Sequence, residues 1–315
     1  MGSKLIATAI AMAAVWPAPS VRAGQFINVL TGGTSGVYYP LGVAIGKIYS
    51  DKLPDVRTQV QATKASVENL ILLQQGRGEI AFAMGDSLKA AWDGDEEAGF
   101  KSRLDRLRLI GAIYPNYIQI VATADSNIKT LADLRGKRLS VGAPKSGTEL
   151  NSRAILAAAG LSYRDIGKVE FLPFAESVEL MKDRQLDATL QSAGLGVASL
   201  KDLSASTEIR LVSVPKEVVD KIGPPFVSGK IPANTYSGQD KDVPTATVAN
   251  YLVTSSAVSD DLVYQMTKLI FENLSELANA HASGKEIKLE TAATGNPIPL
   301  HPGAIRYYKE KGLLK

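Results

Sequence analysis

Two patterns of hydrophobic and polar positions take turns along this chain. Short apolar runs that end at turn residues predict strands at residues 26–31, 56–61, 80–84 and 107–113. Apolar residues at helical spacing lie between these runs, and they predict helices at residues 39–52, 66–75 and 87–92. Strands that alternate with helices in this way indicate parallel sheets covered on both faces.

The same order of elements returns in a second stretch, without a visible repeat of the sequence itself. After an apolar run at residues 117–123, the pattern predicts strands at 138–141, 169–174 and 188–191 and helices at 148–159 and 177–184. Beyond residue 214 the chain is less regular, with a predicted strand at 247–254 and helices after Ser259 and at 302–311. A chain that passes to a second lobe and returns would cross near residues 116–123 and 246–251.

Two glycine-containing loops each join a predicted strand to the start of a helix. The first is residues 31–36, which continue into Tyr38 and Tyr39, and the second is residues 142–149. Glycine lets the backbone approach a ligand closely, and the unpaired N–H groups at a helix start favour an anion. Both loops are expected beyond the carboxyl ends of strands, where such sheets bind ligands. The pattern therefore predicts one small acid held between the two loops. The alternative is that the first loop is only a tight turn and the second only an N-cap, with no ligand at either.

The composition is that of a soluble globular protein long enough for two domains. The chain has 315 residues, of which 45% are hydrophobic and 21% charged. Cysteine is absent, which excludes disulfides and thiolate metal sites. The N-terminal apolar run at residues 5–15 is too short to span a bilayer, and no later apolar run reaches membrane length. We therefore expect a protein that is not itself embedded in a membrane.

The N-terminus has the pattern of a secretion signal. An uncharged run at residues 5–15 follows Lys4 and precedes small residues that end at Ala23, which predicts a cleaved signal peptide at residues 1–23. A buried helix is the alternative. Cleavage would remove Lys4 and Arg22 and leave 33 basic and 32 acidic residues, so the net charge would fall from +3 to +1. A nearly neutral chain offers no electrostatic reason to expect a nucleic-acid partner.

Three stretches taken together resemble one protein family. They are residues 31–41, residues 142–149, and the tail at 296–308, which reads Asn-Pro-Ile-Pro-Leu-His-Pro-Gly-Ala-Ile-Arg-Tyr-Tyr. In these stretches the chain is similar to the TAXI proteins, the TRAP-associated extracytoplasmic solute receptors. The resemblance implies an α/β, two-lobed periplasmic-binding-protein fold of type II, with crossing hinge strands between two mainly parallel sheets flanked by helices. Residues 24–117 and 250–315 would form lobe 1, and residues 118–249 would form lobe 2.

The resemblance also implies a function without catalysis and without a cofactor. A monomeric receptor in the periplasm would close on a small carboxylate such as glutamate, glutamine or 2-oxoglutarate. It would deliver this ligand to a TRAP membrane permease driven by an ion gradient. One alternative is a ligand sensor that docks a membrane receptor. Another is a periplasmic hydrolase that uses Ser146, which would need a base from His281 or His301, the two histidines of the chain.

Matched by position to the family's motifs, the candidate ligand-binding residues lie in the two loops and at the end of a strand in the second lobe: Gly33, Thr34, Ser35, Tyr38, Tyr39, Ser146, Gly147, Thr148, Gln191 and Ser192. Of the two tyrosines, one is expected to contact the ligand while the other packs. Ser35 and Lys145 stand where the family pattern often has glycine. Lys145 would either favour a second carboxylate or face solvent.

Other residues have roles that the sequence leaves open. Met84 is expected on the floor of the pocket, and Asp86 either holds a ligand ammonium or caps the following helix. Tyr236 lies in an irregular segment and is a candidate contact. Lys64 is expected to stay out of the cleft. No acid cluster accompanies either histidine, so no metal site is expected, and His301 is expected to be structural.

Overall fold

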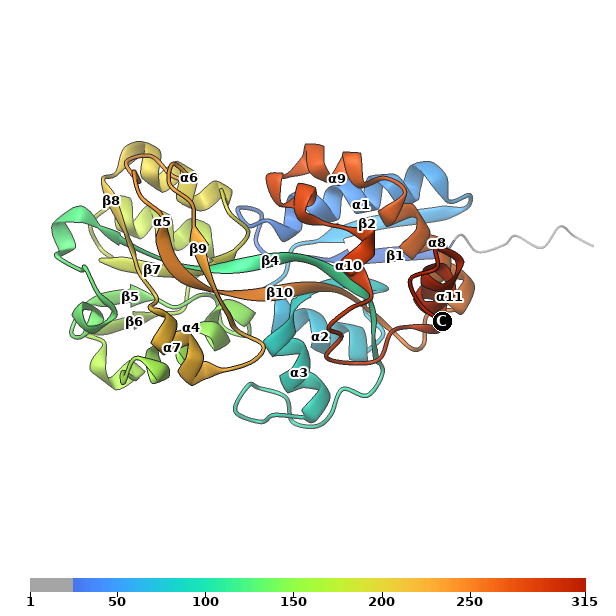
Figure 1. Ribbon diagram of the computed structural model, residues 1–315, viewed down its shortest axis with the longest axis horizontal. Helices are drawn as coiled ribbons and strands as arrows, with labels where there is room; N and C mark the ends of the chain where they lie inside the picture. Colours follow the sequence, from blue (N-terminus) through green and yellow to red (C-terminus); the bar gives the residue numbers. More distant parts are fainter. Residues whose placement is uncertain (1–24) are drawn as a thin grey trace, which may run out of the picture.

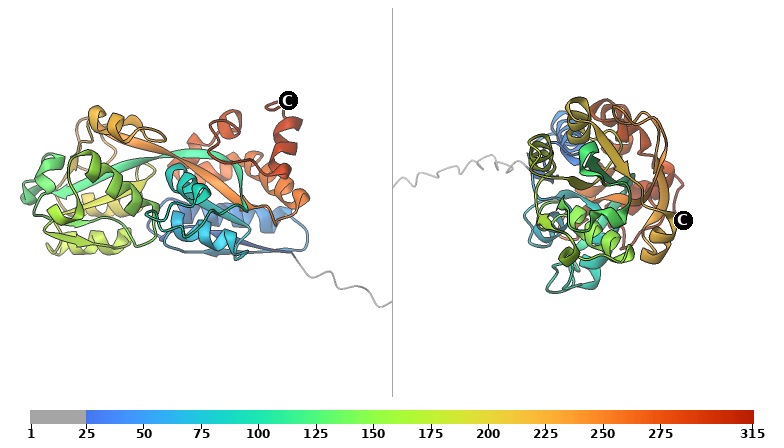
Figure 2. Two further views of the ribbon diagram at one scale, coloured as in Figure 1. Left: turned by 90° about the horizontal axis from the view of Figure 1, so that it is seen from below. Right: turned by 90° about the vertical axis from the view of Figure 1, so that its left-hand side faces the viewer.

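The computed structural model describes residues 25–315, and the signal peptide predicted at residues 1–23 lies outside the described residues. Its elements gather into two halves joined by two long strands (Figure 1). The first half, on the right of Figure 1, contains both the beginning and the end of the described chain, and the second half contains the middle. A view turned by 90° shows the same division, with the long strands passing between the halves (Figure 2).

The first half combines elements from both ends of the described chain. Its strands are β1 (Gln25–Leu30), β2 (Val56–Gln61) and β3 (Ile80–Met84). Its helices are α1 (Tyr38–Lys52), α2 (Ser66–Gln74), α3 (Gly85–Asp93), α8 (Asp260–Phe271), α9 (Leu274–Ala280), α10 (Leu289–Ala292) and α11 (Pro302–Glu310).

The second half is made from the middle of the chain. Its strands are β5 (Arg138–Ser140), β6 (Lys168–Glu170), β7 (Ala188–Ala193), β8 (Ile209–Val212) and β9 (Val227–Ile231). Its helices are α4 (Gly147–Ala158), α5 (Phe174–Lys182), α6 (Ala198–Ser206) and α7 (Lys216–Ile222).

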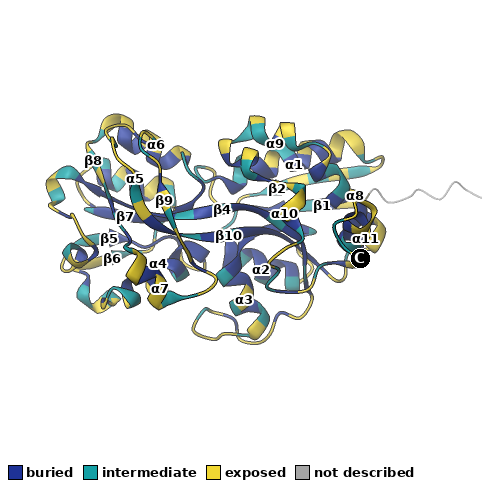
Figure 3. Cartoon of the chain, in the orientation of Figure 1, coloured by how far each residue is buried: buried dark blue, intermediate teal, exposed yellow. Residues whose placement is uncertain are grey.

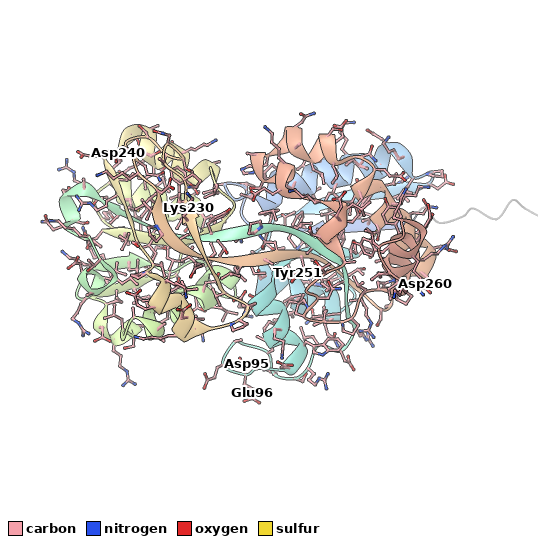
Figure 4. The ribbon with its side chains drawn as sticks, viewed as in Figure 1. Asp95, Glu96, Lys230, Asp240, Tyr251 and Asp260 are labelled. Carbon is pink, nitrogen blue, oxygen red and sulfur yellow. The ribbon has the colours of Figure 1, made fainter. Side chains whose placement is uncertain are left out.

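The described strands form one sheet that continues through both halves. Its path is β2-β1-β3-β10-β4-β7-β5-β6, in which β4 (Leu107–Thr123) and β10 (Val243–Ser255) are the two long strands. The outer strands are parallel to one another, whereas β4 and β10 are antiparallel to their neighbours. β4 pairs with β10 as far as Tyr117 and with β7 from Tyr117 onward, so it passes from one half to the other. The register of β10 against β4 shifts between Ala249 and Tyr251, near the middle of the molecule, where Figure 4 labels Tyr251.

Most of the predicted strands and helices are confirmed within a few residues, and the exceptions have local causes. The runs at 107–113 and 117–123 form the single strand β4, because Pro115 lies beside the register shift, where a proline is tolerated in a sheet. The strand predicted at 169–174 ends at Glu170, because Pro173 precedes the first turn of α5. The pattern at 192–246 predicted no element, yet α6, β8, α7 and β9 lie there.

Apolar side chains fill the space between the sheet and its helices. Figure 3 shows the central strands β3, β4, β7 and β10 largely buried, while the helices expose their outer faces. His301 stabilises the C-terminal end of this arrangement, since its Nδ1 accepts a hydrogen bond from the Gly303 N–H at 3.1 Å at the start of α11. Its Nε2 lies 3.0 Å from the Val258 carbonyl oxygen, so its predicted structural role is confirmed. Within residues 25–315 no helix combines the length and the apolar character needed to cross a bilayer.

Candidate functional site

A cavity of about 130 Å³ lies between the two halves. A water molecule needs roughly 10–15 Å³ on this measure, so the cavity has room for a small organic molecule. Both halves and the strand β4 supply its walls, which are formed by Gly32, Gly33, Gly36, Val37, Tyr38, Thr63, Lys64, Ala65, Met84, Tyr114, Asn116, Ala143, Ser146, Thr148, Pro173, Phe174, Ser192 and Ala193. Because residues from both halves touch the same space, a molecule bound there would contact both.

Three helices begin at this cavity. α1 begins at Tyr38 with no side chain capping it and no acid in its first turn. α4 begins after Ser146, whose Oγ accepts a hydrogen bond from the Glu149 N–H at 3.1 Å. α5 begins at Phe174, also without a side-chain cap. The first N–H groups of a helix have no partner within the helix and carry a partial positive charge, so the cavity favours a negatively charged group.

A chain of buried amides fixes the cavity wall across both long strands. The Tyr38 hydroxyl donates to Oδ1 of Asn250 at 2.5 Å, and Nδ2 of Asn250 donates to Oδ1 of Asn116 at 2.7 Å. Nδ2 of Asn116 in turn donates to the Ser192 carbonyl oxygen at 3.1 Å. The Tyr38 ring stacks on Phe82 with 4.9 Å between centroids. Burial raises the pKa of Tyr38, so its hydroxyl remains a neutral donor.

The two halves are in direct contact beside the cavity. The Glu68 N–H donates to the Lys145 carbonyl oxygen at 3.2 Å, which joins α2 to the loop before α4. Nδ2 of Asn151 on α4 donates to Oδ2 of Asp86 on α3 at 2.6 Å. Burial raises the pKa of the Asp86 carboxyl to about 6, although its hydrogen bonds act in the opposite direction.

A second contact between the halves uses the loop that follows α3, where Figure 4 labels Asp95 and Glu96. Nη1 of Arg153 on α4 donates to the Glu97 carbonyl oxygen in this loop at 2.6 Å. The same guanidinium donates through Nε and Nη2 to the carboxylate of Glu149, at 2.8 and 2.5 Å. The structure therefore has the two halves together, with the cavity between them.

Several of the predicted site residues meet at the cavity. Those that line it are Gly33, Tyr38, Met84, Ser146, Thr148 and Ser192. They come from the first loop, the end of β3, the second loop and the end of β7, so the structure brings together four segments that are far apart in the sequence.

The other predicted residues of the two loops do not line the cavity. Thr34 and Ser35 form the turn before α1, where Thr34 is exposed. Tyr39 is half-buried, because successive residues of a helix point about 100° apart, and Tyr38 takes the cavity side. Lys145 is exposed with a φ of 62°, and its carbonyl group rather than its ammonium makes the contact across the halves. Gly147 is buried against Met84.

Two predicted contacts from the second half have internal partners instead. Gln191 precedes Ser192 in β7 and therefore faces the opposite side of the strand, where its Oε1 accepts from the Ser199 hydroxyl at 2.6 Å. The Tyr236 hydroxyl donates to Oε1 of Gln119 and accepts from the Gly196 N–H at 3.2 Å. Neither residue is among those that line the cavity.

Asp86 and Lys64 also differ from expectation. Asp86 is the second residue of α3, makes no side-chain cap and does not line the cavity, since Asn151 takes up its Oδ2. Lys64 lines the cavity, so the prediction that it stays outside is wrong, but the residue is exposed. Among the described residues that line the cavity, Lys64 has the only charged side chain.

Sequence reasoning missed cavity residues outside the two loops. Tyr114 and Asn116 come from β4, and Pro173 and Phe174 come from the start of α5. A signal for the last pair existed, because they follow β6 as the second loop follows β5, and both strands are parallel neighbours in one sheet. The strand predicted through residue 174 concealed this equivalence.

Metal binding has no support in the described part of the chain, where no three His, Asp or Glu side chains are grouped so that they could hold an ion. Nδ1 of His281 accepts from the Ser283 N–H at 3.1 Å and so caps a short helical turn. Since His281 and His301 both act as caps and neither lines the cavity, Ser146 has no histidine base beside it there.

Comparison with known proteins supports this description. A model of the NMT1-like family matches residues 29–312. The alkanesulfonate-binding protein SsuA from Xanthomonas axonopodis pv. citri, bound to MOPS, is 16% identical over 92% of this chain and 94% of its own, with a TM-score of 0.52. PhnD1 from Prochlorococcus marinus (MIT 9301), in complex with methylphosphonate, is 12% identical over 92% of this chain and 100% of its own, with a TM-score of 0.60. At these identities the likeness concerns the fold, and it confirms the periplasmic-binding-protein architecture expected from the sequence.

Proposed function

The chain belongs to the NMT1-like family, and from this membership and its cavity we propose that it is a solute-binding protein that encloses a small carboxylate between its two halves. The observation that carries the proposal is the meeting of helix starts from both halves at one cavity, those of α1 and α4. A ligand that touches both halves stabilises the closed arrangement more than the open one, which is how such proteins respond to binding.

The fold relatives support an acidic ligand. SsuA is named for alkanesulfonates, and PhnD1 is in complex with methylphosphonate, so both are associated with small molecules that carry an oxyanion. Glutamate, glutamine and 2-oxoglutarate are the carboxylates that the resemblance to TAXI proteins suggests. The protein would act without a cofactor and without catalysis, because a hydrolase built on Ser146 would need a base that the residues lining the cavity do not include.

We further propose that the protein acts as a monomer in the periplasm, after removal of residues 1–23, and delivers its ligand to a TRAP permease. Closure would move lobe 2, residues 118–249, against lobe 1, residues 24–117 and 250–315. The partner change of β4 at Tyr117 and the register shift of β10 after Ala249 are consistent with hinges at these boundaries.

Two experiments test the proposal. Thermal denaturation of the mature protein with a panel of small carboxylates is expected to raise the Tm with at least one of them, because a ligand that binds only the folded state stabilises it. No shift with any member would contradict a carboxylate-binding role. Uptake of the binding acid, measured after deletion of the gene for this protein or of a TRAP permease gene, is expected to fall in both cases. Unchanged uptake together with capture of a membrane receptor would favour the sensor function instead.

A further inference from the structure

The walls of the cavity are mostly apolar. Val37, Tyr38 and Met84 contribute from the first half, and Pro173 and Phe174 contribute from the second. Phe174 approaches the first loop closely, since a methyl group built on Gly36 would lie 3.9 Å from its ring. Burying an apolar surface of the ligand against such walls makes the free energy of binding more favourable, whereas removing a polar or charged group from water makes it less favourable.

Charge is scarce around this space. No Asp or Glu is among the residues from 25 to 315 that line the cavity, and the one lysine there, Lys64, is exposed. An exposed ammonium group is screened by water and adds little to binding. The partial positive charge of the helix starts can compensate one acid group. The ammonium of an amino acid would lack an oppositely charged partner among the described residues that line the cavity, and a second carboxylate would have only the exposed, water-screened Lys64.

Two hydroxyl groups at the cavity have no hydrogen-bond partner among the described residues. They are Oγ of Ser192, a residue 5% exposed, and the hydroxyl of Tyr114, a residue 1% exposed. Both residues line the cavity. Buried hydroxyls are usually hydrogen-bonded, so two partnerless ones beside a cavity are expected to bond a group of the ligand. The two partnerless hydroxyls are an observation independent of the helix starts, and they indicate the same cavity as the ligand-binding site.

We propose that the cavity selects an acid with a single negative charge and an apolar body, and that Ser192 and Tyr114 contact its polar end. This inference rests on the proposed function and narrows it, because it disfavours zwitterionic amino acids such as glutamate and glutamine and the dianion 2-oxoglutarate. The head group can be a carboxylate or a sulfonate, since both present the same single charge to the helix starts.

The first test compares ligands of similar size by isothermal titration calorimetry on the mature protein. We expect 4-methyl-2-oxopentanoate to bind at least about a hundredfold more tightly than L-leucine, which replaces the keto oxygen with an ammonium group, because an unpaired buried charge is costly. A comparable preference is expected over 2-oxoglutarate, which adds a second carboxylate. Hexanoate and hexane-1-sulfonate then distinguish the two possible head groups, and binding of either supports a single charge on an apolar body.

The second test uses variants with matched controls. Ser192→Ala and Tyr114→Phe each remove a partnerless hydroxyl at the cavity, and each is expected to weaken 4-methyl-2-oxopentanoate binding about tenfold or more. Thr189→Val and Tyr307→Phe remove buried hydroxyls that also lack a hydrogen-bond partner within residues 25–315 but do not line the cavity. These control variants are expected to bind as the wild type does, so a general effect of losing a hydroxyl is separated from a contact with the ligand.

The outcomes separate this inference from the proposed function. Tightest binding of glutamate or 2-oxoglutarate would overturn the inference and leave a carboxylate-binding protein. Equal loss of affinity in the cavity variants and the control variants would overturn the roles of Ser192 and Tyr114. Absence of binding by every acid would contradict the proposed function itself.

Discussion

Replacing Gly147 with alanine should oppose closure of the two halves without unfolding either one. Gly147 is the first residue of α4 and lies against the first half. A Cβ atom at this position would lie 2.3 Å from Cε of Met84 and 2.8 Å from the hydroxyl oxygens of Ser66 and Ser87. All three atoms belong to the other half of the molecule, so the collision exists only while the halves are together.

The size of the effect follows from these distances. The end of the Met84 side chain can move aside, but the two serines lie in the first turns of α2 and α3 and have less freedom. Overpacking of this kind typically costs about 1–3 kcal/mol. Because the cost falls on the closed arrangement, it reduces ligand affinity by roughly 5- to 150-fold. The Tm of the ligand-free protein should change little, because an open arrangement avoids the collision.

The assay is a calorimetric titration with the tightest-binding acid, together with the Tm measured with and without that acid. Gly46→Ala provides a matched control, since its Cβ would lie 3.0 Å from Cγ2 of Val60 within the first half. The control should lower the Tm of the ligand-free protein and leave affinity unchanged. Wild-type affinity in Gly147→Ala would refute the idea that binding requires the contact between halves seen here.

Four further predictions concern the residues around the cavity. Asn151→Ala removes the amide that donates a hydrogen bond to Asp86 across the two halves. It should weaken ligand binding about tenfold in the same titration, because hydrogen bonds to charged groups contribute roughly 1.5–3 kcal/mol. Unchanged affinity would contradict a role of this hydrogen bond in closure. Burial raises the pKa of Asp86 from 3.8 to about 6, so the folded state binds the proton of this carboxyl more tightly than the unfolded state does. The resulting stabilisation of the folded state is roughly 3 kcal/mol and is fully present below about pH 3.8. It is lost as the pH rises through 6. Urea denaturation from pH 4 to 7.5 should therefore show Asp86→Asn gaining stability relative to the wild type as the pH rises, and parallel curves would argue against the shift. Tyr39→Ala should change ligand affinity less than about threefold, because Tyr39 does not line the cavity, and a large loss of affinity would show that the pocket lies elsewhere. Ser146→Ala should lower the free energy of unfolding by about 1 kcal/mol, because it removes the side-chain cap of α4.

The order of strands and helices could be predicted because the two hydrophobic periods are strong in this chain. β3 was placed at its observed bounds, and α1 was placed within one residue. The fusion of two apolar runs into β4 could not be foreseen, because Pro115 is tolerated only through a register shift set by the distant strand β10. The short elements between β7 and β10 carry weak periodicity and depend on contacts within the second half.

The candidate site was predictable as two loops but not as a set of side chains. A strand shows which residues alternate but not which set faces the ligand, so Gln191 and Ser192 could not be distinguished in advance. The same holds for Tyr38 and Tyr39, whose orientation depends on how α1 rests on the sheet. Tyr114 and Asn116 reach the cavity only because β4 passes between the halves, which is a property of the tertiary structure.

The most direct test of the account is a crystal structure of the mature protein with its tightest-binding acid. We expect the acid group in the cavity, with about 2.7–2.9 Å between its oxygen atoms and main-chain nitrogen atoms at the start of α1 or α4. An acid group bound to the Lys145 side chain, or outside the space between the two halves, would contradict it.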